Sequence, residues 1–175
     1  MKKFLLGLTL FLSFTLLSAA FFFTGITLAD GRIPWAIFAA LSLLAAIPIW
    51  RWWRRITGSH KFIWNYLYGI VVIAAISSSA FYMSNYFLAD PASKHPVTAT
   101  VVNKYSREQA KRRTVGRRSY YTGEKTYSYH ILLRFETGHV KERPVPVSKY
   151  IKIRIGDKME YDVERGLFGI PVIKH

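Results

Sequence analysis

The sequence contains no cysteine among its 175 residues. Disulfide bonds, thiolate nucleophiles, iron–sulfur clusters and cysteine zinc sites are therefore all excluded. Acidic residues are scarce, because 10 Asp and Glu accompany 25 Lys and Arg for a net charge of +15. Two long stretches have almost no charge of either sign: residues 4–50 hold only Asp30 and Arg32, and residues 62–89 hold none. This distribution excludes a single soluble globule and indicates a membrane protein with a small basic polar domain.

Three apolar segments, 4–29, 33–50 and 62–89, are long enough to cross about 30 Å of hydrocarbon as helices. We therefore predict a three-helix transmembrane region over residues 1–90. The residues 1–20 also resemble a signal peptide, but the apolar run continues to Ala29, which favours an uncleaved helix. The three segments contain no Asp, Glu, Lys, Arg or His, which argues against ion or proton transport. Small residues at Ala75 and Ser79 favour close packing, with the protein's own helices or alternatively with a partner's helix.

Tryptophan and arginine gather between the second and third apolar segments. Indole rings and basic side chains prefer the level of the lipid headgroups, so residues 50–64 are predicted to be an interfacial loop in contact with membrane lipids. The predicted interface residues are Trp50, Arg51, Trp52, Trp53, Arg54, Arg55 and Trp64. The positive-inside rule places this loop and the N-terminus in the cytoplasm and the C-terminal domain outside.

The polar half is predicted to be β-rich. Residues 91–96 form an expected linker with two prolines, and strands are expected at 97–105, 126–136, 140–147, 158–164 and 167–173. Pro144 and Pro146 confine the third of these to a sheet edge or bulge. Residues 148–152 are expected to form one helical turn. Five short strands without a long helix predict a small all-β domain over 97–175, either an SH3-like or an OB-like barrel.

Residues 106–125 form a basic segment that we predict to be a long mobile loop between the first two strands. It contains seven basic and two acidic residues. Three interpretations are open: a solvated charged loop, contact with lipid phosphates or an anionic envelope polymer, and binding to nucleic acid. The last requires a cytoplasmic domain, so no nucleic acid is expected. The candidate residues for binding a partner or an anionic surface are Arg112, Arg113, Arg117, Arg118, Tyr120 and Tyr121.

No pattern of catalytic or metal-binding residues is apparent. The five histidines have no metal-ligand spacing, and neither a G-x-S-x-G motif nor a P-loop occurs. His130 and His139 flank the expected hairpin turn at Thr137-Gly138, so they are expected to approach one another beside Glu136 as solvent-facing residues or as a weak metal site. We predict no enzyme activity, no cofactor and no metal.

Three stretches near the C-terminus carry a resemblance: 147–150 (Val-Ser-Lys-Tyr), 155–161 (Ile-Gly-Asp-Lys-Met-Glu-Tyr) and 166–171 (Gly-Leu-Phe-Gly-Ile-Pro). Residues 97–173 resemble a β-rich module of small bacterial membrane proteins of unknown function. Its marks are a Tyr-rich central strand, a Gly-Asp turn and a terminal Gly-Leu-Phe-Gly. The resemblance implies an envelope-facing module attached to helices and no catalytic residues.

Together these patterns predict a multi-pass protein of the bacterial inner (plasma) membrane with an extracytoplasmic binding domain. Its expected role is that of an accessory or scaffold in an envelope complex, with another envelope protein as partner. The alternatives are a membrane-bound immunity protein against a secreted toxin, an enzyme acting on lipid or cell wall, and a cytoplasmic tether for nucleic acid.

Overall fold

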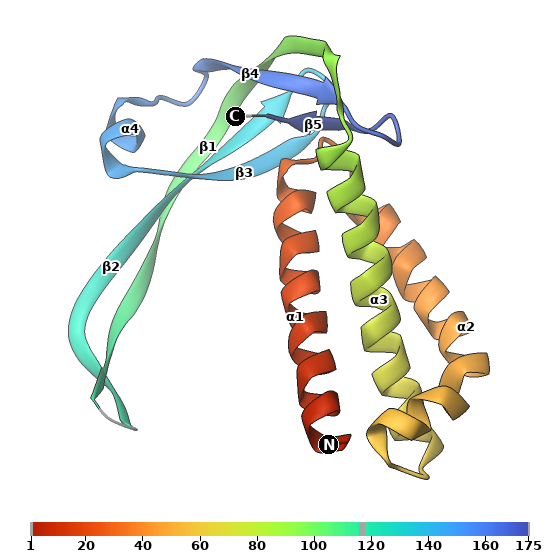
Figure 1. Cartoon of the computed structure of the whole chain (residues 1–175). Coiled ribbons are helices and arrows are strands. Elements are labelled where there is room, and N and C mark those ends of the chain that lie inside the picture. Colours follow the sequence, from red (N-terminus) through yellow and green to blue (C-terminus); the bar gives the residue numbers. More distant parts are fainter. Residues whose placement is uncertain (1, 116–117, 175) are drawn as a thin grey trace. The chain divides into compact units, whose positions relative to one another are not determined.

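The computed structural model describes residues 2–115 and 118–174, with the backbone alone for residues 2–3 and 111–123. The chain forms two compact units, one of residues 1–95 with 163–175 and one of residues 96–162, which we call the helical unit and the strand unit. The elements in chain order are α1 (Lys2–Ile26), α2 (Arg32–Thr57), α3 (Phe62–Phe87), β1 (Asp90–Val115), β2 (Arg118–Phe135), β3 (Val140–Val145), α4 (Val147–Lys152), β4 (Lys158–Arg165) and β5 (Pro171–Ile173) (Figure 1).

The helical unit contains three helices that can span a membrane by length and composition: Phe4–Ile26, Arg32–Thr57 and Phe62–Phe87. At 1.5 Å per residue each is long enough for the hydrocarbon core. Their outward faces carry apolar side chains such as Phe11 and Leu44. In water this exposure would be costly, whereas lipid chains provide an apolar environment for it. The prediction of three apolar helices is confirmed.

The predicted interfacial loop over 50–64 is wrong in extent. Helix α2 continues through Pro48 to Thr57 and ends at Gly58, whose left-handed backbone (φ 68°) lets its N–H bond the Arg54 carbonyl. Only residues 58–61 connect α2 to α3. Tryptophan and arginine are compatible with a helix, so their preference for the interface did not imply a loop.

Helix α3 packs against both other helices through small and polar side chains. The Ser79 hydroxyl donates to the Leu16 carbonyl of α1 (2.7 Å), and the Tyr66 hydroxyl donates to the Leu43 carbonyl of α2 (3.0 Å). Gly69 leaves room for Trp53, because a Cβ at this position would lie 2.6 Å from the indole nitrogen. Ala75 and Ser79 are buried. Ser79 therefore serves packing within the chain, which was the first of our two interpretations.

The last thirteen residues were expected in the β domain, but they form part of the helical unit. The Asn85 side chain of α3 binds the turn 166–170 twice, since Nδ2 donates to the Ile170 carbonyl (3.1 Å) and Oδ1 accepts from the Phe168 N–H (3.1 Å). The Phe168 ring stacks on Phe81 with centroids 4.6 Å apart. The Leu28 N–H donates to the Pro171 carbonyl (2.8 Å). The turn 166–170 is thus held by the helices.

Strands in the order β3-β2-β1-β4-β5 form one antiparallel, curled half-barrel, which confirms a β domain beside the helices. The core residues of the strand unit are Ala99, Val101, Ile131, Leu133 and Phe135. The last three are alternate residues of β2, which matches the strand predicted at 126–136. Strand β3, which contains Pro144, lies at the sheet edge as predicted, and the helical turn is α4. Residues 91–96 are not a linker, because β1 begins at Asp90.

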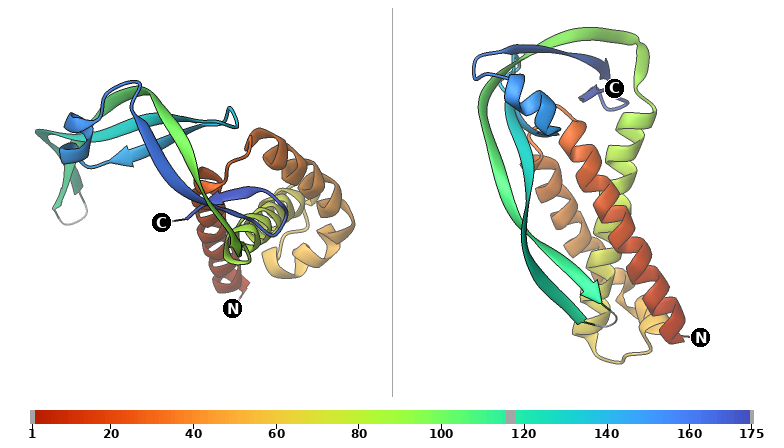
Figure 2. Two further views of the ribbon diagram at one scale, coloured as in Figure 1. Left: turned by 90° about the horizontal axis from the view of Figure 1, so that it is seen from above. Right: turned by 90° about the vertical axis from the view of Figure 1, so that its left-hand side faces the viewer.

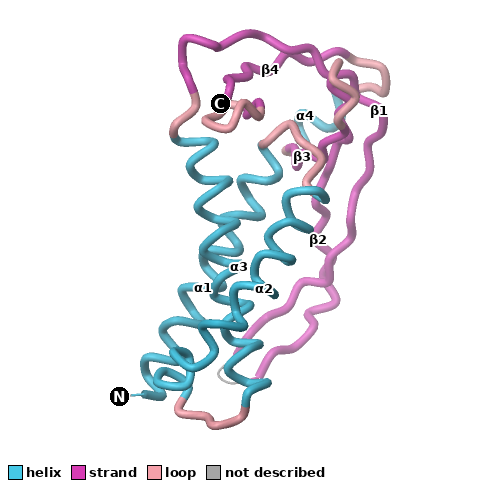
Figure 3. The backbone as a smooth tube through the Cα atoms, turned by 90° about the vertical axis from the view of Figure 1, so that its right-hand side faces the viewer, coloured by secondary structure: helices cyan, strands magenta, loops and turns pink. Residues whose placement is uncertain are grey.

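The basic segment 106–125 is not an irregular loop in its described part. Strands β1 and β2 continue to Val115 and from Arg118, and they pair from Ala99↔Phe135 to Val115↔Arg118. The register shifts twice on the way, between Val101 and Asn103 and between Ala110 and Arg112. Figure 3 shows the two strands side by side along this length, and they appear as one long curved hairpin in both views of Figure 2. Threonine, tyrosine and valine favour the extended conformation, and backbone pairing outweighs the repulsion of solvated charges.

Replacing Gly166 by Ala tests how the C-terminal turn is held. The new Cβ would lie 2.3 Å from the Asn85 Oδ1, so the amide has to move and its two hydrogen bonds are lost. We expect a loss of about 1–3 kcal/mol and a lower unfolding temperature of the full chain in detergent. Gly25→Ala, at a helical glycine with open space around it, is the control. An unchanged unfolding temperature for Gly166→Ala would contradict the role of Asn85.

Candidate functional site

The strand unit extends as a two-stranded ribbon, which we define as residues 104–115 of β1 and 118–128 of β2. Strand β3 pairs with β2 only from Tyr129 to Arg134. At the other edge of the β1–β2 pair, the turn before β4 binds Val101: the Val101 N–H donates to the Asp157 carbonyl, and the Gly156 N–H donates to the Val101 carbonyl. Strand β4 therefore runs along the part of β1 that precedes Val101. Past these points the paired residues of the ribbon have no third strand beside them in the described part of the sheet.

The ribbon contains five of the six predicted binding residues, and its backbone register relates four of them. Arg112 is the cross-strand partner of Tyr121, and Arg113 is the partner of Tyr120. Partners share a face of an antiparallel pair, and consecutive residues alternate between faces. The backbone register therefore pairs one arginine position with one tyrosine position at two successive places along the ribbon. The structure describes only the backbone of these four residues and of Arg118. Arg117 lies outside the described residues.

Ion pairs and backbone contacts hold the start of the ribbon. The Lys125 Nζ lies 2.8 Å from the Glu108 carboxylate across the two strands. The Lys104 Nζ donates to the Tyr150 carbonyl within α4 (3.3 Å) and to the Ile153 carbonyl just after it (2.8 Å). Glu108, one of the two acidic residues of the ribbon, is thus already paired. The eight basic residues in 104–125 exceed what this pairing neutralises.

A polar cluster lies where the ribbon meets the sheet. The His130 Nδ1 is 2.8 Å from the Glu142 carboxylate of β3, and the Arg107 Nη2 is 3.4 Å from the same group. The Tyr105 ring stacks on His130 with centroids 5.5 Å apart, and the Arg107 guanidinium lies over the Tyr105 ring. Sequence spacing did not identify Glu142 as the partner of His130, because the pairing of β2 with β3 brings them together.

The same cluster places Ser128 next to His130, with the hydroxyl 3.1 Å from Nε2. Hydroxyl, imidazole and carboxylate in this order are the parts of an acyl-transfer triad. A triad also requires the base to be oriented by a hydrogen bond at Nδ1, yet this nitrogen has only a close charge contact and no hydrogen bond among the described residues. We therefore interpret the cluster as a charged surface at the start of the ribbon.

The structure does not bring His130 and His139 together. His130 is the cross-strand partner of Pro144, whereas His139 lies beyond the turn next to the end of β2. Among the described residues no three His, Asp and Glu side chains are grouped as a metal site requires.

Burial shifts the pKa values of Tyr161 and Arg143 in the strand unit. Desolvation raises the pKa of Tyr161, an effect partly offset by the positive charge of Arg143, and desolvation lowers the pKa of Arg143. The Arg143 Nε and Nη2 are buried without a hydrogen-bond partner in the described part of the chain. This pair lies on the side of the sheet that carries the apolar core residues.

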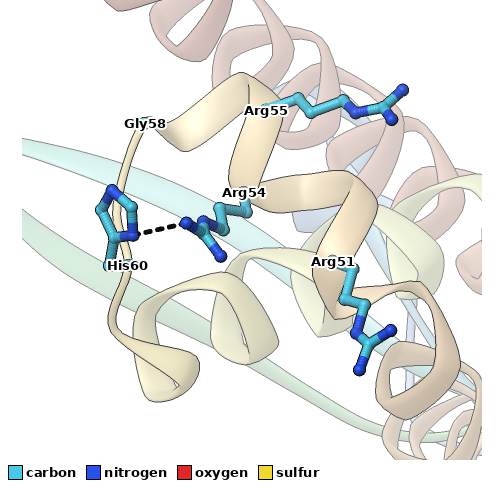
Figure 4. Close-up of a pocket in the computed structure, with 5 residues that line it drawn as sticks. All are labelled: Arg51, Arg54, Arg55, Gly58 and His60. Carbon is cyan, nitrogen blue, oxygen red and sulfur yellow. Dashed lines mark hydrogen bonds between the residues drawn. The ribbon is translucent and has the colours of Figure 1, made fainter.

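The predicted membrane-interface residues occupy the last turns of α2 and the first of α3. Arg51, Arg54, Arg55, Gly58 and His60 line a hollow of about 400 Å³, and the Arg54 guanidinium donates to the His60 Nδ1 (2.6 Å) (Figure 4). Trp52 and Trp64 are exposed. Trp53 differs from the prediction, because it is buried inside the helical unit and its ring contacts Tyr68 with centroids 5.3 Å apart.

No protein-family model, curated protein or solved structure matches this chain. The assignment of a function therefore depends on the geometry and charge described above.

Replacing Glu142 by Gln tests the polar cluster. A hydrogen bond to the Glu142 carboxylate is the main cause that raises the pKa of Tyr105, because it stabilises the neutral phenol. We expect Glu142→Gln to lower the Tyr105 pKa toward its ordinary value. The measurement is an NMR titration of ring-labelled tyrosine, with Tyr105→Phe to assign the signal. A Tyr105 pKa equal to that of the wild type would show that the contact is absent in solution.

The fall of the protein's unfolding temperature at alkaline pH tests the burial of Tyr161. Unfolding exposes its phenol, which then ionises near pH 10, whereas the folded state keeps it neutral to higher pH. The contribution is therefore complete below about pH 10 and is lost as the pH rises through the raised pKa. We expect Tyr161→Phe to reduce the fall in unfolding temperature between pH 8 and pH 10.5. Tyr127→Phe, at an exposed site of the same sheet, controls for the loss of a hydroxyl.

Proposed function

We propose that this protein is a membrane-anchored binding protein whose ribbon docks on an acidic face of another envelope protein. The observation that supports this most directly is the ribbon itself, a paired extension of β1 and β2 with seven basic and two acidic residues. An isolated two-stranded hairpin is marginally stable in water, and a surface partner would stabilise it. Arginine opposite tyrosine is also a combination that is enriched where proteins bind one another.

The proposed location is the bacterial inner membrane, with the N-terminus in the cytoplasm and the strand unit outside. Six basic residues lie at the ends of the spans on the side of the 58–61 connection, against one at the opposite turn. With the strand unit outside the cytoplasm, the proposed role is that of an accessory or scaffold in an envelope complex. Nucleic acid is not a partner in this location. Within the all-β class, the order β3-β2-β1-β4-β5 with α4 before β4 favours an OB-like over an SH3-like barrel.

Topology is the first test of this proposal. Alkaline phosphatase and green fluorescent protein are fused separately after residue 175 of the full chain. Active phosphatase with a dark fluorescent protein is the expected result. Inactive phosphatase with a bright fluorescent protein would place the strand unit in the cytoplasm and contradict an envelope partner.

Charge removal tests the ribbon directly. Replacing Arg112, Arg113, Arg117 and Arg118 by Ser should weaken capture of crosslinked envelope partners roughly tenfold or more, since each exposed ion pair contributes about 0.2–1 kcal/mol. The matched control replaces Lys149, Lys152, Arg154 and Lys158 by Ser, which removes the same charge from exposed positions at α4 and β4. Equal loss in both variants would mean that net charge, and not the ribbon, determines binding. Circular dichroism checks that both remain folded.

A further inference from the structure

The arginines at the end of α2 have no acidic side chain in α2 or α3 that could neutralise their charge. No acidic residue occurs between Asp30 and Asp90. Arg54 donates to the Nδ1 of His60 instead. Positive charges near low-dielectric surroundings require anions, and lipid phosphates are the anions present at this depth. The negative end of the α2 dipole accounts for part of the charge, but it falls off within the last turn, and Arg51 precedes that turn.

A second hollow lies beside the same connection and has the opposite chemistry. Its volume is about 470 Å³, within the range of pockets that bind small molecules. It is lined by Leu6, Leu10, Thr57, Ser59, Trp64, Leu67, Tyr68 and Val71. Trp64 and Leu67 remain about half exposed or more, at 62% and 49%. The hollow is therefore an apolar groove that opens to the outside of the helical unit.

The two hollows share one short stretch of chain. Gly58 and His60 line the arginine pocket, whereas Thr57 and Ser59 line the apolar groove. Consecutive Cα atoms are about 3.8 Å apart, so the two hollows are separated by little more than the backbone of this connection. The Asn65 Nδ2 donates to the Ser59 carbonyl (2.9 Å), which fixes the connection between them.

We propose that the arginine pocket and the apolar groove form one binding site for an anionic phospholipid. The phosphate lies against Arg51, Arg54 and Arg55, and an acyl chain lies in the groove between α1 and α3. A headgroup phosphate and its acyl chain are joined covalently at the membrane interface, which matches a cationic and an apolar hollow on two sides of one connection. A zwitterionic lipid would bring its ammonium group near three guanidinium groups and is disfavoured. The site is independent of the ribbon and its partner.

The first experiment needs no variant. The full chain is purified in detergent and given phosphatidylglycerol or phosphatidylcholine with identical acyl chains, and retained lipid is counted by native mass spectrometry. We expect phosphatidylglycerol to be retained roughly tenfold more tightly, from the attraction between several basic residues and one anionic headgroup. Equal retention of the two lipids overturns the proposal. Unfolding temperature measured with the same lipids provides a second readout, since a ligand that binds only the folded state raises it.

Two variants separate the two halves of the site. Arg54→Gln with Arg55→Gln should abolish the preference for phosphatidylglycerol, and Leu10→Phe should reduce retention by filling the groove while leaving the arginines in place. Arg32→Gln, at the other end of α2, is the matched control and should keep the wild-type preference. If Arg54→Gln with Arg55→Gln retains the preference for phosphatidylglycerol, the proposal is wrong. If that variant does not fold, the lipid retention of Leu10→Phe and of the wild type still tests the proposal.

Inorganic phosphate and glycerol phosphate, added without lipid, test whether the acyl chain matters. We expect neither to raise the unfolding temperature at the concentration at which phosphatidylglycerol does. If inorganic phosphate gives the same increase, the arginines bind a free anion and the phospholipid site is refuted. Failure of the topology test would leave these results unchanged, because the lipid experiments are done on the purified chain.

Discussion

The hydrogen bonds of Asn85 tie the end of the chain to its third helix. One amide side chain accepts from the Phe168 N–H and donates to the Ile170 carbonyl, and Phe168 stacks on Phe81 beside it. The amide is buried, so its two partners are needed to offset the loss of water. Because of these contacts, residues 163–175 belong to the helical unit, and the strand unit is an insertion whose two ends both begin in that unit. A segment fixed at both ends loses less entropy on folding than a free C-terminal domain.

The same arrangement explains how the polar half manages without disulfide bonds or a large core. Few residues of the strand unit are fully buried, and the sheet is a half-barrel and not a closed one. Its edge strand β3 contains Pro144 and charged neighbours, which discourage pairing with foreign strands. The charge that this small domain does not need for folding is concentrated in the ribbon. This concentration of basic residues is the basis of our proposal that the ribbon contacts an acidic surface.

The two proposals for this protein concern regions that differ in how their basic side chains are neutralised. In the strand unit, carboxylates such as Glu108 and Glu142 pair with basic neighbours and shape a surface for a protein partner. In the membrane-spanning part no carboxylate is present, so the arginines of α2 must find anions elsewhere. The apolar groove beside them makes lipid the anion that satisfies both charge and burial. The two proposals thus assign protein contact and lipid contact to separate surfaces of the protein.

Composition and periodicity alone determined that three apolar helices precede a β-rich domain, because hydrophobic length and the two-residue alternation of strands are local properties. The edge position of β3 followed from its prolines. Tertiary structure alone decided the rest. Long-range pairing turned the basic segment into paired strands, and brought Glu142 to His130 instead of His139. Side-chain packing placed Trp53 inside the helices and the C-terminal turn on Asn85. Such contacts join residues far apart in the chain, and their energy depends on register and close packing, which no local pattern encodes.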